Sequence, residues 1–172
     1  MGAGTESPAQ YVKTVAAGAA TGGARQFVSF RIGEEEYAID IMAVREIKGW
    51  TETTALPNQP EFILGILNLR GTIVPIFDLR CRFGMGLTDA SKTHVVIIVS
   101  VLDRMMGLLV DAVSDILTVS SNEIRPVPDM DRTVSAEFLS GIITVNDSMV
   151  VLLSLENLFS RGTLAAAGAA AA

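Results

Sequence analysis

The sequence contains an internal repeat, and this repeat restricts the possible folds more than any other feature of the chain. AVREI (residues 43–47) matches AVSDI (112–116), and FILGILNLRGTIVPIFDL (62–79) matches FLSGIITVNDSMVVLLSL (138–155). The first pair is offset by 69 positions and the second by 76, so the second copy has seven additional residues, which fall in the Pro-rich stretch IRPVPDMDRTV. A chain of 172 residues written in two copies predicts two small, similar units that share a core.

Each copy has the pattern of about five short strands. In the first copy, QFVSFRI (26–32) alternates between two sets of side chains, and GEEEYAIDI (33–41) resumes the strand pattern after a Gly-led acidic turn. The segments VREIKGW, GILNLR and TIVPIFDL complete the set. Five short strands followed by a helical turn are typical of a small closed or nearly closed barrel, because closure removes exposed strand edges. We therefore predict a mostly β protein with two five-stranded barrels packed side by side and short helices.

The turns and the helix starts also repeat. We expect one hairpin to turn at Arg70-Gly71 and the matching hairpin to turn at residues 146–148, because Gly, Asn and Asp tolerate the positive φ angles of tight hairpins. Asp78 and Ser154 occupy matching positions after the last strand of each copy. Both are suitable N-cap residues, so each copy is predicted to end in a short helix.

Composition separates the repeated region from the two ends of the chain. We expect a flexible N-terminal tail over 1–25, a first barrel over 26–90, a second barrel over 91–162 and an Ala-rich tail over 163–172. The densest apolar run, HVVIIVSVL from His94, is about half of the ~18 to 20 residues that a membrane-spanning helix needs, so we expect no membrane insertion. A net charge of -6 without clustered cations argues against nucleic-acid binding.

Residues that usually carry catalysis or bind metals are scarce. His94 is the only histidine and Cys81 the only cysteine, which leaves too few donors for an ordinary transition-metal site and excludes an internal disulfide. A single cysteine fits a reducing compartment, and we expect a cytoplasmic protein. Phosphate-binding glycine motifs are absent from the sequence, and Asp111 and Asp115 are expected to form turns and caps. We therefore predict no enzyme activity, no metal and no cofactor.

The remaining candidates for function are apolar residues at two matching bends between strands. They are Ile41, Val44, Val113 and Ile116. Two interpretations are open: either the barrels cover these side chains, or both bends face one groove between the barrels. An exposed apolar groove with a polar rim is the mark of an interaction site, and Arg70 with Glu46 would supply that rim.

At these residues the sequence resembles the CheW family, adaptors that couple bacterial chemoreceptors to the histidine kinase CheA. The resemblance extends over residues 26–159 and is carried, in this order, by EYAIDIMAVREIKGW, FILGILNLRGTIVPIFDLR, GLLVDAVSDIL with the following IRPVP, and FLSGIITVNDSMVVLLSLENLF. It implies two five-stranded SH3-like barrels without catalysis. It also implies two partners, the regulatory domain of CheA and the cytoplasmic tip of methyl-accepting chemoreceptors, and a location at the inner face of the membrane through chemoreceptor arrays.

The resemblance also implies which residues make these contacts. Matching positions assign the receptor-binding groove to Ile41, Val44, Glu46, Arg70, Val113 and Ile116, and the kinase contact to Leu56 and Gly65. The second barrel would touch another kinase subunit in the array. We favour an ion pair between Arg70 and Glu46, since an isolated rim charge contributes little.

Two alternatives remain at this stage. One is a CheW-like domain of a larger signalling protein, although the sequence has no phosphotransfer helix and no nucleotide-binding glycines, so we expect a stand-alone adaptor. The other is a small-ligand-binding β-barrel protein that uses Arg70 as an anion clamp. The two tails carry no motif that maps onto the family.

Overall fold

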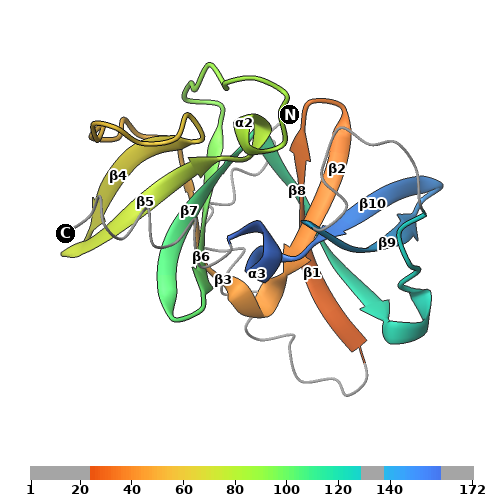
Figure 1. The fold of residues 1–172 in the computed structure, drawn as a ribbon. Coiled ribbons are helices and arrows are strands. Elements are labelled where there is room, and N and C mark those ends of the chain that lie inside the picture. The colour runs from red at the N-terminus through yellow and green to blue at the C-terminus, as the bar shows by residue number, and fades with distance from the viewer. Residues whose placement is uncertain (1–23, 129–137, 160–172) are drawn as a thin grey trace, which may run out of the picture.

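The computed structural model describes residues 24–128 and 138–159, which form a mostly β fold with two five-stranded sheets. The two sheets lie side by side (Figure 1). The predicted tails, apart from residues 24 and 25, lie outside the described residues. In the described part of the chain, no helix is long and apolar enough to cross a membrane.

The strand order is β8-β1-β2-β10-β9 in the first sheet and β3-β6-β7-β5-β4 in the second. The first sheet contains β8 (Ala112–Ser120), β1 (Ala24–Ile32), β2 (Glu35–Asp40), β10 (Ser148–Leu153) and β9 (Leu139–Val145). The second sheet contains β3 (Val44–Gly49), β6 (Val95–Val101), β7 (Arg104–Val110), β5 (Thr72–Asp78) and β4 (Ile63–Leu69). Neighbouring strands are antiparallel, except that β2 runs parallel to β10 and β5 runs parallel to β7.

This strand order means that the two copies of the repeat exchange a hairpin. The hairpin β1-β2 of the first copy joins β8, β9 and β10 of the second copy, and the hairpin β6-β7 joins β3, β4 and β5. The chain crosses between the sheets at η1 (Ile41–Ala43) and again at Asp111, between β7 and β8. The expected division into 26–90 and 91–162 therefore separates strands that belong to one sheet. The correction is that each sheet contains strands from both copies, so the two units are interlocked.

The predicted turns and helix caps are present in both copies. Arg70 and Gly71 have φ angles of 51° and 90°, and Asn146 and Asp147 have φ angles of 48° and 65°, as a tight two-residue hairpin turn requires. The short helices α2 (Leu79–Arg82) and α3 (Leu155–Leu158) follow β5 and β10.

Each helix begins with the side-chain hydrogen bond expected of its N-cap. The backbone N–H of Cys81 donates to Oδ1 of Asp78 over 3.4 Å, and the N–H of Asn157 donates to Oγ of Ser154 over 3.3 Å. The matching sequence positions of the two copies thus have matching local structures.

One isolated bridge joins the edges of each sheet and gives it a barrel-like form. Thr54, after β3, exchanges backbone hydrogen bonds of 3.0 and 2.9 Å with Ile66 of β4, and Arg125, after β8, exchanges bonds of 2.9 and 2.8 Å with Ile142 of β9. The bridge segment approaches β4 so closely that a Cβ atom on Gly65, whose φ is 145°, would collide with the carbonyl oxygen of Thr54. A glycine is therefore required at this position.

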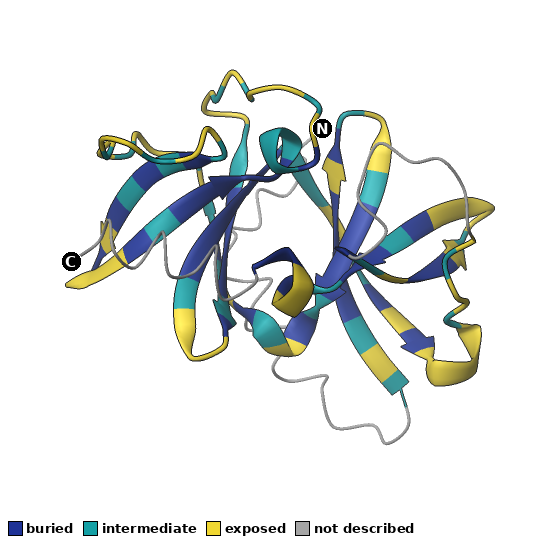
Figure 2. Cartoon of the chain, viewed as in Figure 1, coloured by how far each residue is buried: buried dark blue, intermediate teal, exposed yellow. Residues whose placement is uncertain are grey.

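The main core lies where the two sheets meet (Figure 2). Its cluster contains buried side chains of both sheets, including Phe30 and Tyr37 of the first and Phe77 of the second. The ring of Phe159, which follows α3, lies 4.7 Å from the ring of Phe77 between centroids. Two smaller clusters each consist of side chains from the strands of one sheet and form the core of that barrel-like unit. Because the shared cluster takes side chains from both sheets, neither sheet can bury its apolar face alone.

Candidate interaction surface

The predicted ion pair between Arg70 and Glu46 is present. Nη2 of Arg70 lies 2.9 Å from Oε2 of Glu46, which joins the β4-β5 turn to strand β3. The turn itself is fixed by a 2.8 Å hydrogen bond from the N–H of Gly71 to Oδ1 of Asn68. The side chain of Arg70 is 79% exposed and that of Glu46 is 28% exposed. An exposed pair of this kind stabilises a fold by only about 0.2–1 kcal/mol, so its main effect is to hold the arginine in place.

The four apolar residues of the proposed groove contact one core cluster but differ in exposure. Ile41 and Val44 are buried in the cluster between the sheets, with 6% and 9% of their surface exposed. Val113 and Ile116 are partly buried and pack against the same cluster from β8, where they lie opposite residues of β1. For Ile41 and Val44, the interpretation that the fold covers them holds. Val113 and Ile116 retain surface that a partner can contact.

Met42 is an exposed apolar residue at the same bend that the sequence analysis did not select. It lies in η1 between Ile41 and Ala43 and is 70% exposed. The backbone N–H of Met42 donates a 2.9 Å hydrogen bond to Oδ1 of Asp40, and this bond starts the helical turn. An N-cap residue immediately before IMA is the signal that could have predicted this turn, and with it an outward side chain.

The two residues assigned to the kinase contact are placed differently. Leu56 lies in the connection between β3 and β4 and is partly exposed. Gly65 is buried in β4 beneath the bridge segment at Thr53 and Thr54, and Oγ1 of Thr53 donates a 3.1 Å hydrogen bond to the carbonyl oxygen of Leu64. Gly65 therefore allows this segment to approach β4, and of the two residues only Leu56 has a side chain that is partly exposed.

Asp111 and His94 form a polar cluster that connects the two sheets. Oδ2 of Asp111 accepts hydrogen bonds from the N–H of Gly33, at 2.7 Å, and from Nη2 of Arg80, at 2.8 Å. Nε2 of His94 lies 3.5 Å from Oδ1 of Asp111, and Nδ1 of His94 accepts a 3.0 Å hydrogen bond from the N–H of Ser91. Because each of these groups already has a structural partner, the cluster ties the β1-β2 turn to α2 and to the start of β6.

Cys81 lacks the environment of a reactive thiol. Burial raises the pKa of the Cys81 thiol, and the negative charges of Asp78 and Glu61 raise it further. A raised pKa keeps the thiol protonated, whereas a catalytic cysteine needs the opposite shift. Within the described ranges, no three His, Cys, Asp or Glu side chains are grouped closely enough to hold a metal ion.

Comparison with known proteins assigns the chain to a family. A model of the CheW-like domain matches residues 26–162. The chain belongs to the CheW family. Two chemotaxis proteins named CheW are similar over 139 residues: the probable CheW of Rhizobium etli is 46% identical and the CheW of Rhizobium meliloti is 44% identical. Each of these matches covers 81% of this chain and 90% of the relative.

A solved structure supports the same assignment. The crystal structure of the scaffolding protein TtCheW from Thermoanaerobacter tengcongensis has a TM-score of 0.73 and 39% sequence identity, over 81% of this chain and 90% of that chain. The interlocked pair of five-stranded sheets is therefore a CheW fold, consistent with SH3-like barrels, and the protein is a chemotaxis coupling adaptor.

Proposed function

We propose that this CheW-family protein couples the cytoplasmic tip of methyl-accepting chemoreceptors to the regulatory domain of the histidine kinase CheA. It acts in the cytoplasm, at the inner face of the membrane, as part of chemoreceptor arrays. The adaptor binds both partners without catalysing a reaction. The observation that carries the proposal is the 2.9 Å ion pair between Glu46 and the 79% exposed Arg70, because it presents a fixed guanidinium at the border of the proposed groove.

The receptor contact combines this polar rim with apolar side chains. Val113 and Ile116 are partly buried against the shared core, so they are held in place while part of their surface stays available. Ile41 and Val44 support the groove from beneath, since they are buried in the same cluster. A helical hairpin fits such a surface, because helix-in-groove recognition uses apolar anchors along one helix face.

The kinase contact lies on the second sheet, around Leu56. Gly65 shapes this region because only glycine allows Thr53 and Thr54, shortly before Leu56, to lie against β4. The protonated Cys81 and the partnered His94 support a role without catalysis.

A charge-reversal series tests the receptor contact. Arg70→Glu should weaken binding to a receptor-tip fragment by about tenfold while the circular dichroism spectrum stays unchanged, since Arg70 is on an exposed turn. Lys92→Glu is the matched control, because Lys92 is also exposed and lies in the connection between α2 and β6. If Arg70→Glu unfolds the protein, or binds the receptor fragment as wild type does, the proposed role of Arg70 is wrong.

The double variant Arg70→Glu, Glu46→Arg separates two roles of this arginine. If the pair only orders the groove, the reversed pair restores it and binding returns. If Arg70 also contacts the receptor, binding stays weak although the pair has been rebuilt. Isothermal titration with the same receptor fragment distinguishes the two outcomes.

A further inference from the structure

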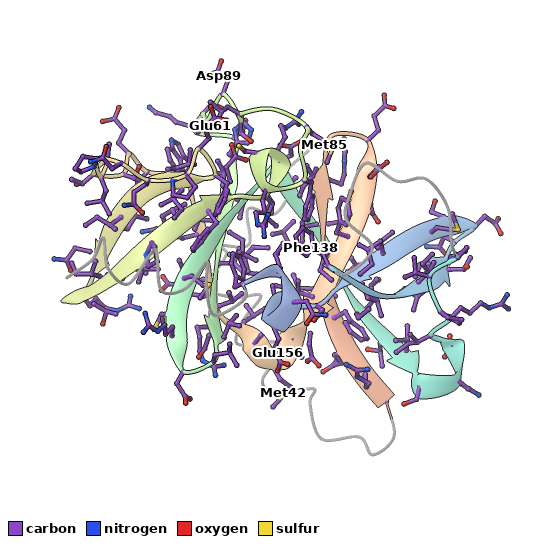
Figure 3. All side chains as sticks on the ribbon, viewed as in Figure 1. Met42, Glu61, Met85, Asp89, Phe138 and Glu156 are labelled. Atoms are coloured by element: carbon purple, nitrogen blue, oxygen red, sulfur yellow. The ribbon has the colours of Figure 1, made fainter. Side chains whose placement is uncertain are left out.

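Arg82 stands out because two aromatic rings from distant parts of the chain flank its guanidinium. Its Cζ atom lies 5.0 Å from the ring centroid of Phe62 and 4.6 Å from that of Phe138. The two phenylalanines occupy matching positions of the repeat, immediately before β4 and β9. Arg82, on α2, therefore lies where the two sheets meet, and Figure 3 shows Phe138 in this region.

The charge of Arg82 has no counter-ion among the described residues. The ion pairs found there use Arg25, Arg70, Arg80 and His94 as cations. Nε of Arg82 is buried without a hydrogen-bond partner. Arg25 provides a contrast: it also lies over a ring, 5.0 Å from the centroid of Phe27, but it forms an ion pair with Asp40 at 3.2 Å. An arginine stays protonated under all ordinary conditions, so the positive charge of Arg82 is not neutralised by any residue that the structure describes.

The surroundings of this charge are largely apolar. Phe62 and Met85 are partly buried and pack against the shared core, and Phe138 is buried in it. Figure 3 shows Met85 close to α2, and Phe138 lower in the view, closer to α3. A cation held between two rings, one of them on the partly exposed Phe62, fits a carboxylate that is itself flanked by apolar residues. We call Phe62, Arg82 and Phe138 the Arg82 surface.

The Arg82 surface is separate from the proposed receptor groove. Phe62 precedes the first residue of β4, and Arg70 follows the last. Seven residues of extended strand span about 23 Å, so one helical tip cannot be centred on both sites. Phe62 is three residues from Gly65 and four from Ile66, which pairs with Thr54 of the bridge segment, and Leu56 follows Thr54 by two residues.

We propose that the Arg82 surface binds an acidic side chain of the histidine kinase, adjacent to the contact at Leu56. This inference rests on the proposed function for the identity of the partner. The two rings hold the guanidinium before binding, so little side-chain freedom is lost when the complex forms. A carboxylate then pairs with a cation that has no counter-ion in the described ranges, and the Arg82 surface contributes both charge and apolar area to the kinase contact.

The test compares Arg82→Gln, which removes the charge, with Arg82→Lys, which keeps it. Binding of the full chain to full-length kinase is measured by isothermal titration at low and moderate salt, with thermal melts to verify folding. We expect Arg82→Gln to raise the dissociation constant by about tenfold, the effect of losing one charge-assisted hydrogen bond, and to reduce its salt dependence. Arg82→Lys should retain most of the affinity. Arg25→Gln is the matched control, since it removes a ring-stacked arginine that already has a counter-ion.

Four outcomes decide the matter. Kinase binding that is lost in Arg82→Gln and retained in Arg82→Lys, with receptor binding unchanged, supports the proposal. If Arg82→Gln binds the kinase as wild type does while Leu56→Asp does not, the Arg82 surface is wrong and the adaptor role stands. If neither variant changes kinase binding, the assigned kinase contact fails as well. If Arg82→Gln unfolds, the folded Arg82→Lys variant decides: loss of its kinase binding, or kinase affinity that does not fall with added salt, overturns the proposal, because the lysine keeps the positive charge.

Discussion

Replacing Gly65 with alanine should destabilise the protein through one identifiable contact. A Cβ atom at this position would collide with the carbonyl oxygen of Thr54 and would lie 2.8 Å from Oγ1 of Thr53. The bridge segment would have to move away from β4. Its movement would break the two backbone hydrogen bonds between Thr54 and Ile66 and the bond from Thr53 to Leu64.

The size of the effect follows from these losses. Three hydrogen bonds contribute about 0.5–1.5 kcal/mol each, and the φ angle of 145° adds about 1–3 kcal/mol of strain for a residue with a Cβ. Since part of the segment can relax, we expect Gly65→Ala to lower the free energy of unfolding by about 4 kcal/mol. Native domains have only about 5–15 kcal/mol of stability, so the variant should be close to unfolding.

Urea denaturation followed by circular dichroism measures this change directly. Gly71→Ala is the control, because Gly71 also has a positive φ, of 90°, but a Cβ there would meet no atom within 4 Å. Backbone strain alone should lower the stability of this control by about 1–2 kcal/mol. Equal destabilisation by the two substitutions would refute the argument that the bridge segment requires glycine at position 65.

Three further predictions concern the core, the surface and the thiol. When the chain is produced as two fragments, 1–90 and 91–172, each should remain unfolded, and mixing them should restore β-sheet circular dichroism. The reason is that both sheets contain strands from both copies. A folded 1–90 fragment would contradict the hairpin exchange. Val113→Asp should lower stability by about 1–2 kcal/mol and abolish capture of a receptor fragment in a pull-down, since Val113 is only partly buried; capture at wild-type strength would show that this bend is not the contact. Iodoacetamide should modify Cys81 more slowly in the folded protein than in urea at pH 8, because a raised pKa reduces the thiolate fraction. Glu61→Gln should speed the reaction of the folded protein by lowering that pKa. An unchanged rate in Glu61→Gln would exclude the influence of Glu61.

Local features of the fold could be predicted from the sequence because they depend on neighbouring residues. The turns at Arg70-Gly71 and Asn146-Asp147 and the cap at Asp78 follow from the conformational preferences of single residues. The hairpin exchange could not be predicted in the same way. Alternating side chains define a strand but do not say which sheet receives it, and the repeat offsets are the same whether a copy pairs with itself or with the other copy.

The candidate site was likewise predictable from the sequence only in part. The Arg70 and Glu46 pair was predicted and is present. The sequence left open whether Ile41 is covered or faces a groove, and the structure shows it buried, because a helical turn at η1 interrupts the two-residue period of the preceding strand and directs Met42 outward instead. The contacts of Arg82 join segments that are far apart in the sequence, so only the folded chain brings its two aromatic partners together.

The most direct test of the adaptor role asks whether one molecule holds both partners at once. The full chain is mixed with the CheA regulatory domain and a receptor-tip fragment, and the mixture is separated by size-exclusion chromatography with light scattering. We predict a single species whose mass equals that of all three components. With Arg70→Glu in place of the wild type, the species should lack the receptor fragment but keep the CheA regulatory domain. Two binary complexes that never combine would mean that the partners compete for one surface, and this result would contradict the account.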